Sequence, residues 1–282
     1  MRVIRSVKTM QRLVSQARRQ GKRVGFVPTM GALHEGHLSL MRRCRRENDL
    51  TVVSIFVNPA QFGPTEDFKA YPRPVKADQR LAGKAGVDIL FYPSDKEMYP
   101  DPYRTYIEVE KMTENLCGKF RPGHFKGVAT VVGKLLNIVQ PDVLYLGQKD
   151  AQQAVVLKQM VRDLNFPVTV KVCPIVRGPD GAALSSRNVY LTPQERRQAA
   201  VLFRSLQEAK EKIQSGERSL AAVVQGIRRR ILKETSGKID YVACVNAQTL
   251  EPLSCVDGKI LIALAVRFGS TRLIDNILVQ VR

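Results

Sequence analysis

Two histidines stand three residues apart in the segment Pro28-Thr-Met-Gly-Ala-Leu-His-Glu-Gly-His37, and the chain holds only one other histidine. An apolar run at residues 24–27 precedes this segment, and from Leu38 onward apolar residues recur at helical spacing. We therefore predict a strand, a tight turn at the glycines and a helix whose first turn carries His34 and His37. The unpaired N–H groups and the positive dipole end of such a helix start favour an anion. The segment predicts a phosphate site at the edge of a parallel sheet.

The two histidines also allow other interpretations. They could cap the helix, or they could be solvated and bind nothing. A zinc site is disfavoured, because the histidines of the His-Glu-x-x-His metalloprotease pattern stand four residues apart. The G-x-G-x-x-G and Walker patterns of other nucleotide-binding loops are missing, so the phosphate hypothesis depends on matching residues elsewhere in the chain.

Uncharged amides follow the second predicted strand, in Phe56-Val-Asn-Pro-Ala-Gln-Phe62. The amides of Asn58 and Gln61 can bind hydroxyl and carboxylate groups with fixed geometry and no net charge. A turn with surface amides is an equally good explanation. Further on, Arg121-Pro-Gly-His-Phe125 places the third histidine and an arginine in a turn.

Two later segments offer groups suited to a nucleotide. Lys149 is a point charge for phosphate, Asp150 can accept ribose hydroxyls, and Gln153 lies one helical turn later on the same side. Leu184-Ser-Ser-Arg-Asn188 offers two hydroxyls and an arginine for anionic oxygens, on a loop predicted to be mobile because residues 177–183 are rich in turn formers. A solvated helix start and a linker are the alternatives.

The elements that must position these residues alternate along the chain. Strands that alternate with helices indicate a parallel sheet covered on both faces, in which ligands bind beyond the carboxyl ends of the strands. The predicted strands are residues 24–27, 51–57, 87–91, 143–146 and 168–172, and the predicted helices between them are residues 38–46, 75–85, 128–139 and 151–165. An apolar stripe at Val7, Met10, Val14 and Ala17 predicts one more helix before the first strand.

The chain changes character near residue 176. Thr192-Pro-Gln-Glu195 has the capping-box pattern with proline at the first helical position, which predicts a helix to about residue 215. A second helix is predicted at residues 219–236, followed by strands at residues 239–245, 259–265 and 273–281. We predict an α/β domain with a parallel sheet, residues 1–176, and a smaller α+β domain, residues 177–282.

Composition sets bounds on the function. The 282 residues, 44% hydrophobic and 25% charged, describe an ordinary soluble globular protein, and no apolar run approaches the ~20 residues needed to cross a bilayer. Five cysteines without a C-x-x-C pair favour a reducing cytoplasm over a disulfide scaffold. The net charge of +19 favours anionic partners. Because the basic residues are spread along the chain and aromatic residues are few, we expect no nucleic-acid partner. Because no apolar run is long enough, we expect no membrane either.

The chain resembles the pantothenate synthetase (pantoate–β-alanine ligase) family in the order and spacing of its motifs. These motifs are the segments at residues 28–37, 56–62, 121–125 and 184–188, together with Tyr71-Pro-Arg73, Gly147-Gln-Lys-Asp150 and Gln152-Gln153. The likeness extends over nearly the whole chain, to Arg272-Leu-Ile-Asp-Asn276. The resemblance implies an AMP-forming ligase of pantothenate and coenzyme A biosynthesis, which joins pantoate to β-alanine through a pantoyl adenylate and releases AMP and pyrophosphate. It also implies a Rossmann-like domain of the nucleotidyltransferase type, a C-terminal lid domain, ATP with Mg²⁺, a homodimer and the cytoplasm.

The resemblance also assigns roles by position. The implied catalytic residues are His37, His34, Lys149 and Arg187. The implied ATP-binding residues are Met30, Gly31, Ala32, Leu33, His34, Glu35, Gly36, His37, Gly147, Gln148, Lys149, Asp150, Val176 (through its backbone), Leu184, Ser185, Ser186 and Arg187. Pantoate is assigned to Gln61, Gln153, Asn58 and Arg121, and β-alanine to Gln61.

Two positions depart from the family's pattern. Gln148 stands where the family often has glutamate, and we expect only a local effect. The acidic cluster that can follow Tyr-Pro-Arg is reduced to Asp78, because Val75, Lys76 and Ala77 precede it. Asp78 is therefore the candidate metal residue, although ATP is expected to supply most of the Mg²⁺ coordination.

Two other functions fit parts of the sequence. A related nucleotidyltransferase would attach AMP to a phosphorylated acceptor, but the amides of Gln61 and Gln153 suit a small hydroxy acid better than a second phosphate. A basic nucleic-acid-binding protein would account for the charge, and its binding would weaken steeply with salt.

Overall fold

The computed structural model describes residues 1–64 and 66–281, and the chain divides into two compact units. Unit 1 comprises Met1–Val109, Arg121–Gly147 and Val156–Pro174, and unit 2 comprises Glu110–Phe120, Gln148–Val155 and Ile175–Arg282. The last segment of unit 2 begins at Ile175, close to the predicted division after residue 176, but unit 2 also includes residues 110–120 and 148–155. That residues 1–176 and 177–282 form two domains stays a prediction.

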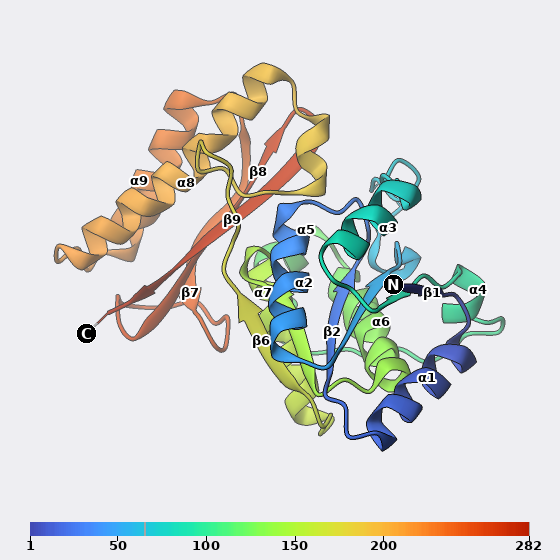
Figure 1. Cartoon of the computed structure of the whole chain (residues 1–282). Helices are drawn as coiled ribbons and strands as arrows, with labels where there is room; N and C mark the ends of the chain where they lie inside the picture. The colour runs from blue at the N-terminus through green and yellow to red at the C-terminus, as the bar shows by residue number, and fades with distance from the viewer. Residues whose placement is uncertain (65, 282) are drawn as a thin grey trace. The chain divides into compact units, whose positions relative to one another are not determined.

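Unit 1 is built on a six-stranded sheet in the order β1-β4-β3-β2-β5-β6. All neighbouring strands are parallel, as predicted for this part of the chain, and Figure 1 labels β1, β2 and β6. Its strands are β1 (Arg2–Ile4), β2 (Val24–Thr29), β3 (Leu50–Ile55), β4 (Ile89–Phe91), β5 (Val143–Gly147) and β6 (Thr169–Cys173). The order reverses at β2, which lies between β3 and β5. At such a switch point the connections leave a crevice beyond the carboxyl ends of the strands. The sequence did not predict β1, because three residues are too few to show a pattern.

Helices cover the sheet of unit 1. They are α1 (Val7–Arg19), α2 (Glu35–Glu47), α3 (Val75–Lys84), α4 (Asp95–Met98), α6 (His124–Val139) and most of α7 (Ala151–Asp163). Helix α2 packs on β2, β3 and β5, with Met41 and Cys44 in the buried core. Helix α6 begins earlier than predicted, because Gly123 takes a left-handed conformation and starts the helix at His124.

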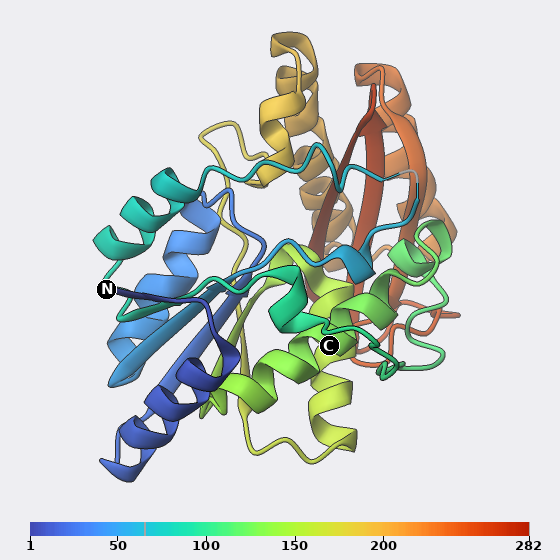
Figure 2. The same cartoon turned by 90° about the vertical axis from the view of Figure 1, so that its right-hand side faces the viewer.

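Unit 2 contains a three-stranded antiparallel sheet of β7 (Lys238–Asn246), β8 (Lys259–Phe268) and β9 (Thr271–Gln280), with β8 in the middle. Helices α8 (Pro193–Gln214) and α9 (Leu220–Glu234) pack together and against this sheet (Figure 2). The predicted capping box is confirmed: Thr192 Oγ1 accepts from the Glu195 N–H at 3.2 Å, and the Glu195 carboxylate accepts from the Thr192 N–H at 2.8 Å. The short helix α5 (Leu116–Phe120), which the sequence did not predict, contacts β7 and β8.

The five cysteines are all free, four of them buried and Cys255 exposed. Across the two stretches that the structure describes, none of the helices combines the length and the apolar character that spanning a bilayer requires.

Candidate functional site

The turn after β2 depends on a glycine and a buried carboxylate. Gly31 and Ala32 both have positive φ, and a Cβ atom on Gly31 would lie 2.9 Å from Asp78 Oδ2 and from Ile55 Cγ2. Only glycine fits there without displacing the neighbours. Asp78 Oδ2 accepts from the Ala32 N–H at 2.9 Å, and Asp78 Oδ1 accepts from the Leu33 N–H at 2.8 Å. The carboxylate therefore fixes the backbone that leads into α2.

His34 and His37 together cap the start of α2. His34 is the N-cap residue and its Nδ1 accepts from the Gly36 N–H at 3.1 Å, while His37 Nδ1 accepts from the His34 N–H at 3.4 Å. The two ring centroids lie 4.1 Å apart. The capping interpretation is thus confirmed. It is compatible with phosphate binding, because capping engages Nδ1 of each ring and a ligand would be bound through Nε2.

Asn58 has its amide committed inside the protein. Its Nδ2 donates to Gln61 Oε1 and to the Gly127 carbonyl, each at 3.0 Å, and its Oδ1 accepts from the Tyr99 hydroxyl at 2.7 Å. The side chain is only 1% exposed. The hypothesis that Asn58 binds a small acid directly is not favoured by these contacts, which indicate instead that it orients Gln61.

Gln61 ends the short helix η1 (Pro59–Gln61) and is 8% exposed. Its Nε2 lies 3.0 Å from Met30 Sδ, so the structure brings these two predicted site residues together. Its backbone carbonyl accepts from His124 Nδ1 at 2.9 Å. The amide is therefore fixed from several sides and can present a defined hydrogen-bonding pattern.

Arg121 is paired with Glu66, a residue that sequence reasoning missed. Arg121 Nε donates to Glu66 Oε1 and Arg121 Nη2 to Oε2, both at 2.6 Å. Burial raises the pKa of Glu66, but the hydrogen bonds and charge of Arg121 outweigh burial and hold the pKa below its ordinary value. His124 Nδ1 donates to a carbonyl, so its Nε2 accepts from Arg121 Nη1 at 3.0 Å. The paired guanidinium supports the Gln61 segment, which disfavours the hypothesis that it binds pantoate directly.

The metal hypothesis for Asp78 does not fit its surroundings. Both carboxylate oxygens already accept backbone N–H groups, and the residue is 1% exposed. Burial raises its pKa, although the hydrogen bonds from Leu33 and Ala32 oppose that shift. Within residues 1–64 and 66–281, no cluster of three or more His, Cys, Asp or Glu residues could hold a metal ion. Asp78 is therefore committed to the backbone of the turn, and its contacts do not favour it as a Mg²⁺ ligand.

A cavity of about 520 Å³ opens beyond the carboxyl ends of β3 and β4, at the edge of the sheet where the sequence predicts that ligands bind. Met30, Phe56 and Asp78 line it together with two cations, Arg73 and Lys96. The Arg73 guanidinium donates to the carbonyls of Tyr71 and Phe68, which ties down the loop that encloses one wall.

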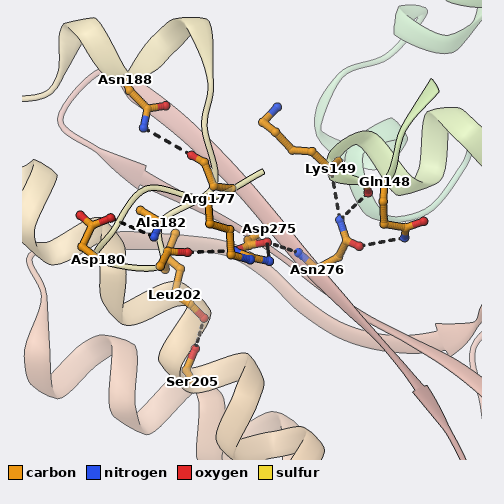
Figure 3. A network of polar contacts seen from close by, with 12 residues as sticks. Gln148, Lys149, Arg177, Asp180, Ala182, Asn188, Leu202, Ser205, Asp275 and Asn276 are labelled. Atoms are coloured by element: carbon orange, nitrogen blue, oxygen red, sulfur yellow. Dashed lines mark hydrogen bonds and ion pairs between the residues drawn. The ribbon is translucent and has the colours of Figure 1, made fainter. Parts of the chain in front are cut away.

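In unit 2, the segment after β5 forms the short helix η2 (Gln148–Asp150) and is fixed by Asn276 of β9 (Figure 3). Asn276 Nδ2 donates to the carbonyls of Gln148 and Lys149 at 3.0 Å, and Asn276 Oδ1 accepts from Gln148 Nε2 at 3.0 Å. A glutamate at position 148 has no N–H to donate to this oxygen. Lys149 Nζ lies 3.5 Å from Asp150 Oδ2. The Lys149 side chain extends away from Asn276 (Figure 3).

Gln153 lies in the first turn of α7 and is partly exposed. Its neighbour Gln152 is buried, accepts from the Cys117 N–H at 2.8 Å and donates to the Asn115 carbonyl at 2.9 Å. Of these two neighbouring glutamines, Gln152 is therefore the structural one, which leaves Gln153 as the binding candidate.

The stretch rich in turn formers, residues 177–183, forms a hairpin. Arg177 pairs with Ala183 in a β-bridge, and the Leu184 N–H donates to the Val176 carbonyl at 3.0 Å. The Arg177 guanidinium forms two hydrogen bonds to Asp275, at 2.6 and 2.9 Å. The sequence predicted the turns correctly. It could not predict that Arg177 binds Asp275, because Asp275 lies almost a hundred residues later in the chain. The Val176 carbonyl accepts this one bond, and because a carbonyl oxygen has a second lone pair, the backbone contact to adenine stays a prediction.

The residues predicted to bind phosphate follow this hairpin. Ser185 caps the short helix η3 (Ser186–Tyr190), because its Oγ accepts from the Arg187 N–H at 3.3 Å. Ser185, Ser186 and Arg187 are partly exposed in unit 2. Sequence reasoning missed Asp275 and Asn276 as functional candidates, although two polar residues inside the apolar pattern of β9 were a visible signal.

Comparisons with known proteins agree over the whole chain. The model of the pantoate–β-alanine ligase family matches residues 2–278. A pantothenate synthetase of Caldicellulosiruptor saccharolyticus is 57% identical over 279 residues, covering 99% of both chains, and one of Acetivibrio thermocellus is 56% identical over 281 residues, covering 100% of both.

Solved structures are similar as well. A pantothenate synthetase of Thermus thermophilus has a TM-score of 0.94 at 46% identity, covering 98% of this chain and 99% of that one. A pantoate–β-alanine ligase of Francisella tularensis, described as complexed with β-γ ATP and β-alanine, has a TM-score of 0.82 at 37% identity, covering 99% and 97%.

Proposed function

The chain belongs to the pantoate–β-alanine ligase family, and on this premise we propose that it condenses pantoate with β-alanine at the expense of ATP. The products are pantothenate, AMP and pyrophosphate, and the intermediate is pantoyl adenylate. The observation that carries the proposal is the fixed amide of Gln61, 3.0 Å from Met30 at the start of the segment that His34 and His37 cap. This segment follows β2 at the switch point of the sheet, where α/β folds bind nucleotides.

In the first step, a pantoate carboxylate oxygen forms a bond to the α-phosphorus of ATP, and the bond from that phosphorus to the pyrophosphate oxygen breaks. Negative charge gathers on the phosphate oxygens, so positioned donors and cations are the main contribution that a protein makes. His34 and His37 are proposed to donate from Nε2, and Lys149 and Arg187 to supply positive charge. Ser185 and Ser186 add hydroxyl donors to the β- and γ-phosphates.

The same proposal assigns the remaining residues of the nucleotide site. ATP is bound by the backbone of residues 30–37 and 147–150, with Asp150 on the ribose, and by residues 184–187. Both β2 and β5 end at the same edge of the sheet, and Gln148 follows directly on Gly147. This connectivity supports the assignment of both segments to one ATP molecule.

Gln61 and Gln153 are proposed to bind pantoate, with Gln61 also next to β-alanine. In the second step the amine nitrogen of β-alanine attacks the carbonyl carbon of the adenylate, AMP leaves with the bonding electrons, and the nitrogen gives up a proton. This step depends on a held geometry more than on a strong base. The fixed hydrogen bonds around the Gln61 amide support such a role.

Mg²⁺ is proposed to enter with ATP, since this ion usually keeps its waters and substrate phosphates as ligands. The protein is also proposed to form a homodimer and to act in the cytoplasm. Unpaired cysteines and the use of ATP are consistent with a reducing, ATP-containing compartment. Light scattering tests the dimer, whose mass would be twice that of the 31.6 kDa chain.

The test is product analysis with purified protein. With ATP, pantoate and β-alanine we expect AMP and pantothenate in equal amounts, and no sustained turnover when either acid is left out. Formation of ADP would refute adenylation. Sustained release of pyrophosphate without β-alanine would support a nucleotidyltransferase instead.

A further inference from the structure

Two adjacent residues of β9, Asp275 and Asn276, are buried and polar in a strand that is otherwise largely apolar. Each is 3% exposed. Side chains alternate across a strand, so the two point to opposite faces of the sheet. Asp275 pairs with Leu264, which belongs to the core under α8 and α9, and Asn276 pairs with Ala263.

On one face, Asp275 holds the hairpin that precedes the loop Leu184–Arg187. It accepts from both terminal nitrogens of Arg177, whose guanidinium also lies 3.6 Å from the centre of the Phe203 ring. Arg177 Nη1 donates to the Gly181 carbonyl at 3.1 Å as well, so a single partly buried cation ties the hairpin to β9 and closes it (Figure 3). A bidentate pair of this kind fixes orientation as well as distance.

On the other face, Asn276 holds the backbone of Lys149. The carbonyls of Gln148 and Lys149 can only accept, which fixes the Asn276 amide with Nδ2 toward both of them. Asn276 Oδ1 then accepts from Gln148 Nε2, so both donor hydrogens and the carbonyl oxygen of the amide have partners. A carboxylate at position 276 would place an oxygen against two carbonyl oxygens.

One strand therefore sets the positions of two segments that carry cations. Strand β9 pairs with β8 in unbroken register from Thr271 to Gln280, so its backbone is a rigid reference for both faces. We propose that Asp275 and Asn276 are positioning residues for adenylate formation, which hold Lys149 and the loop Leu184–Arg187 at the spacing that the triphosphate of ATP requires. This inference rests on the proposed function, because it needs ATP as the shared ligand.

The test is Asn276→Asp, with Asn246→Asp as the matched control. Asn246 lies on β7 of the same sheet, and its Oδ1 accepts from the N–H groups of Gln248 and Thr249. An aspartate keeps those two bonds, so this control should be as active as the wild type. The rate of pantoate-dependent exchange of pyrophosphate into ATP reports the first step. Reaction of synthetic pantoyl adenylate with β-alanine reports the second.

For Asn276→Asp we expect a ~10- to 100-fold slower exchange, the usual size when a catalytic group is displaced by about 1 Å. The second step, which needs no triphosphate, and the KM for pantoate should stay within about twofold. If this variant does not fold, Asn276→Ala removes the donors without adding charge and should show the same split. Normal exchange in the folded variant, or equal slowing of both steps, would overturn the inference. Absence of pantoate-dependent exchange in the wild type would instead refute the proposed function.

Discussion

Gly127 of α6 packs against the backbone of η1, so a side chain at position 127 should displace Gln61. A Cβ atom at position 127 would lie 2.2 Å from the Ala60 carbonyl oxygen and 2.6 Å from Gln61 Cα. Even a separation of 3.0 Å would require the backbone of η1 to move by about 0.8 Å. The neighbouring atoms are backbone, so they cannot rotate away. Gly127→Ala should therefore displace the residue proposed to bind pantoate.

Displacement of a binding group by about 1 Å can cost ~10²-fold, so we expect kcat/KM for pantoate to fall by about 10- to 100-fold in Gly127→Ala. Overpacking should lower the free energy of unfolding by about 1–3 kcal/mol, while the better helix propensity of alanine should raise it by about 1 kcal/mol. The assay combines steady-state kinetics, with pantoate varied, and urea unfolding. KM for ATP should change little.

Gly133→Ala is the matched control, because it lies in the same helix and gains the same propensity. Its Cβ would lie 2.4 Å from Cδ1 of Ile107, the end of a side chain that can rotate away, and the next two neighbours, at 3.9 Å, are also side-chain atoms. This variant should keep its kcat/KM for pantoate within about threefold, well short of the loss expected at position 127. Unchanged kinetics in Gly127→Ala, or an equal loss in both variants, would refute the argument.

Two further substitutions test residues of the site, and a third tests a charged group at the end of α2. His37→Ala should lower kcat by ~10²–10³-fold with the fold intact, as for one lost transition-state donor, and normal turnover would show that His37 is not such a donor. Asp78→Asn should lower the free energy of unfolding by about 1–3 kcal/mol, because one buried N–H loses its acceptor. The Mg²⁺ concentration for half-maximal activity should stay the same. A large rise in that concentration would show that Asp78 is a metal residue after all. Hydrogen bonds from Lys171, Tyr145 and Arg43 lower the pKa of Glu47 to about 2, so its contribution is present above the unfolded pKa near 4.5 and is lost as pH falls toward 2. Glu47→Gln should lower the free energy of unfolding by about 1–2 kcal/mol at pH 7, a value reduced for the partial exposure of Glu47, and by less at pH 2.5. An equal loss at both pH values would contradict the lowered pKa of Glu47.

Much of the fold follows from local patterns. The apolar runs that became β2, β3 and β5, and the capping box at Thr192, are recognisable because each signal lies within a few consecutive residues. The motif residues also fall after strands, and the carboxyl ends of parallel strands must meet at one edge of the sheet. The sequence alone therefore determined the fold class and the segments that carry the chemistry.

The tertiary structure decided which polar side chains are available to a ligand. Asn58, Asp78 and Arg121 have residue types that suit pantoate, Mg²⁺ or phosphate, yet each is engaged by partners that lie tens of residues away in the chain. The pairing of Arg177 with Asp275 likewise turns a turn-rich stretch into a fixed hairpin. A buried polar group must find a hydrogen-bond partner, and only the packed chain determines which distant residue provides it.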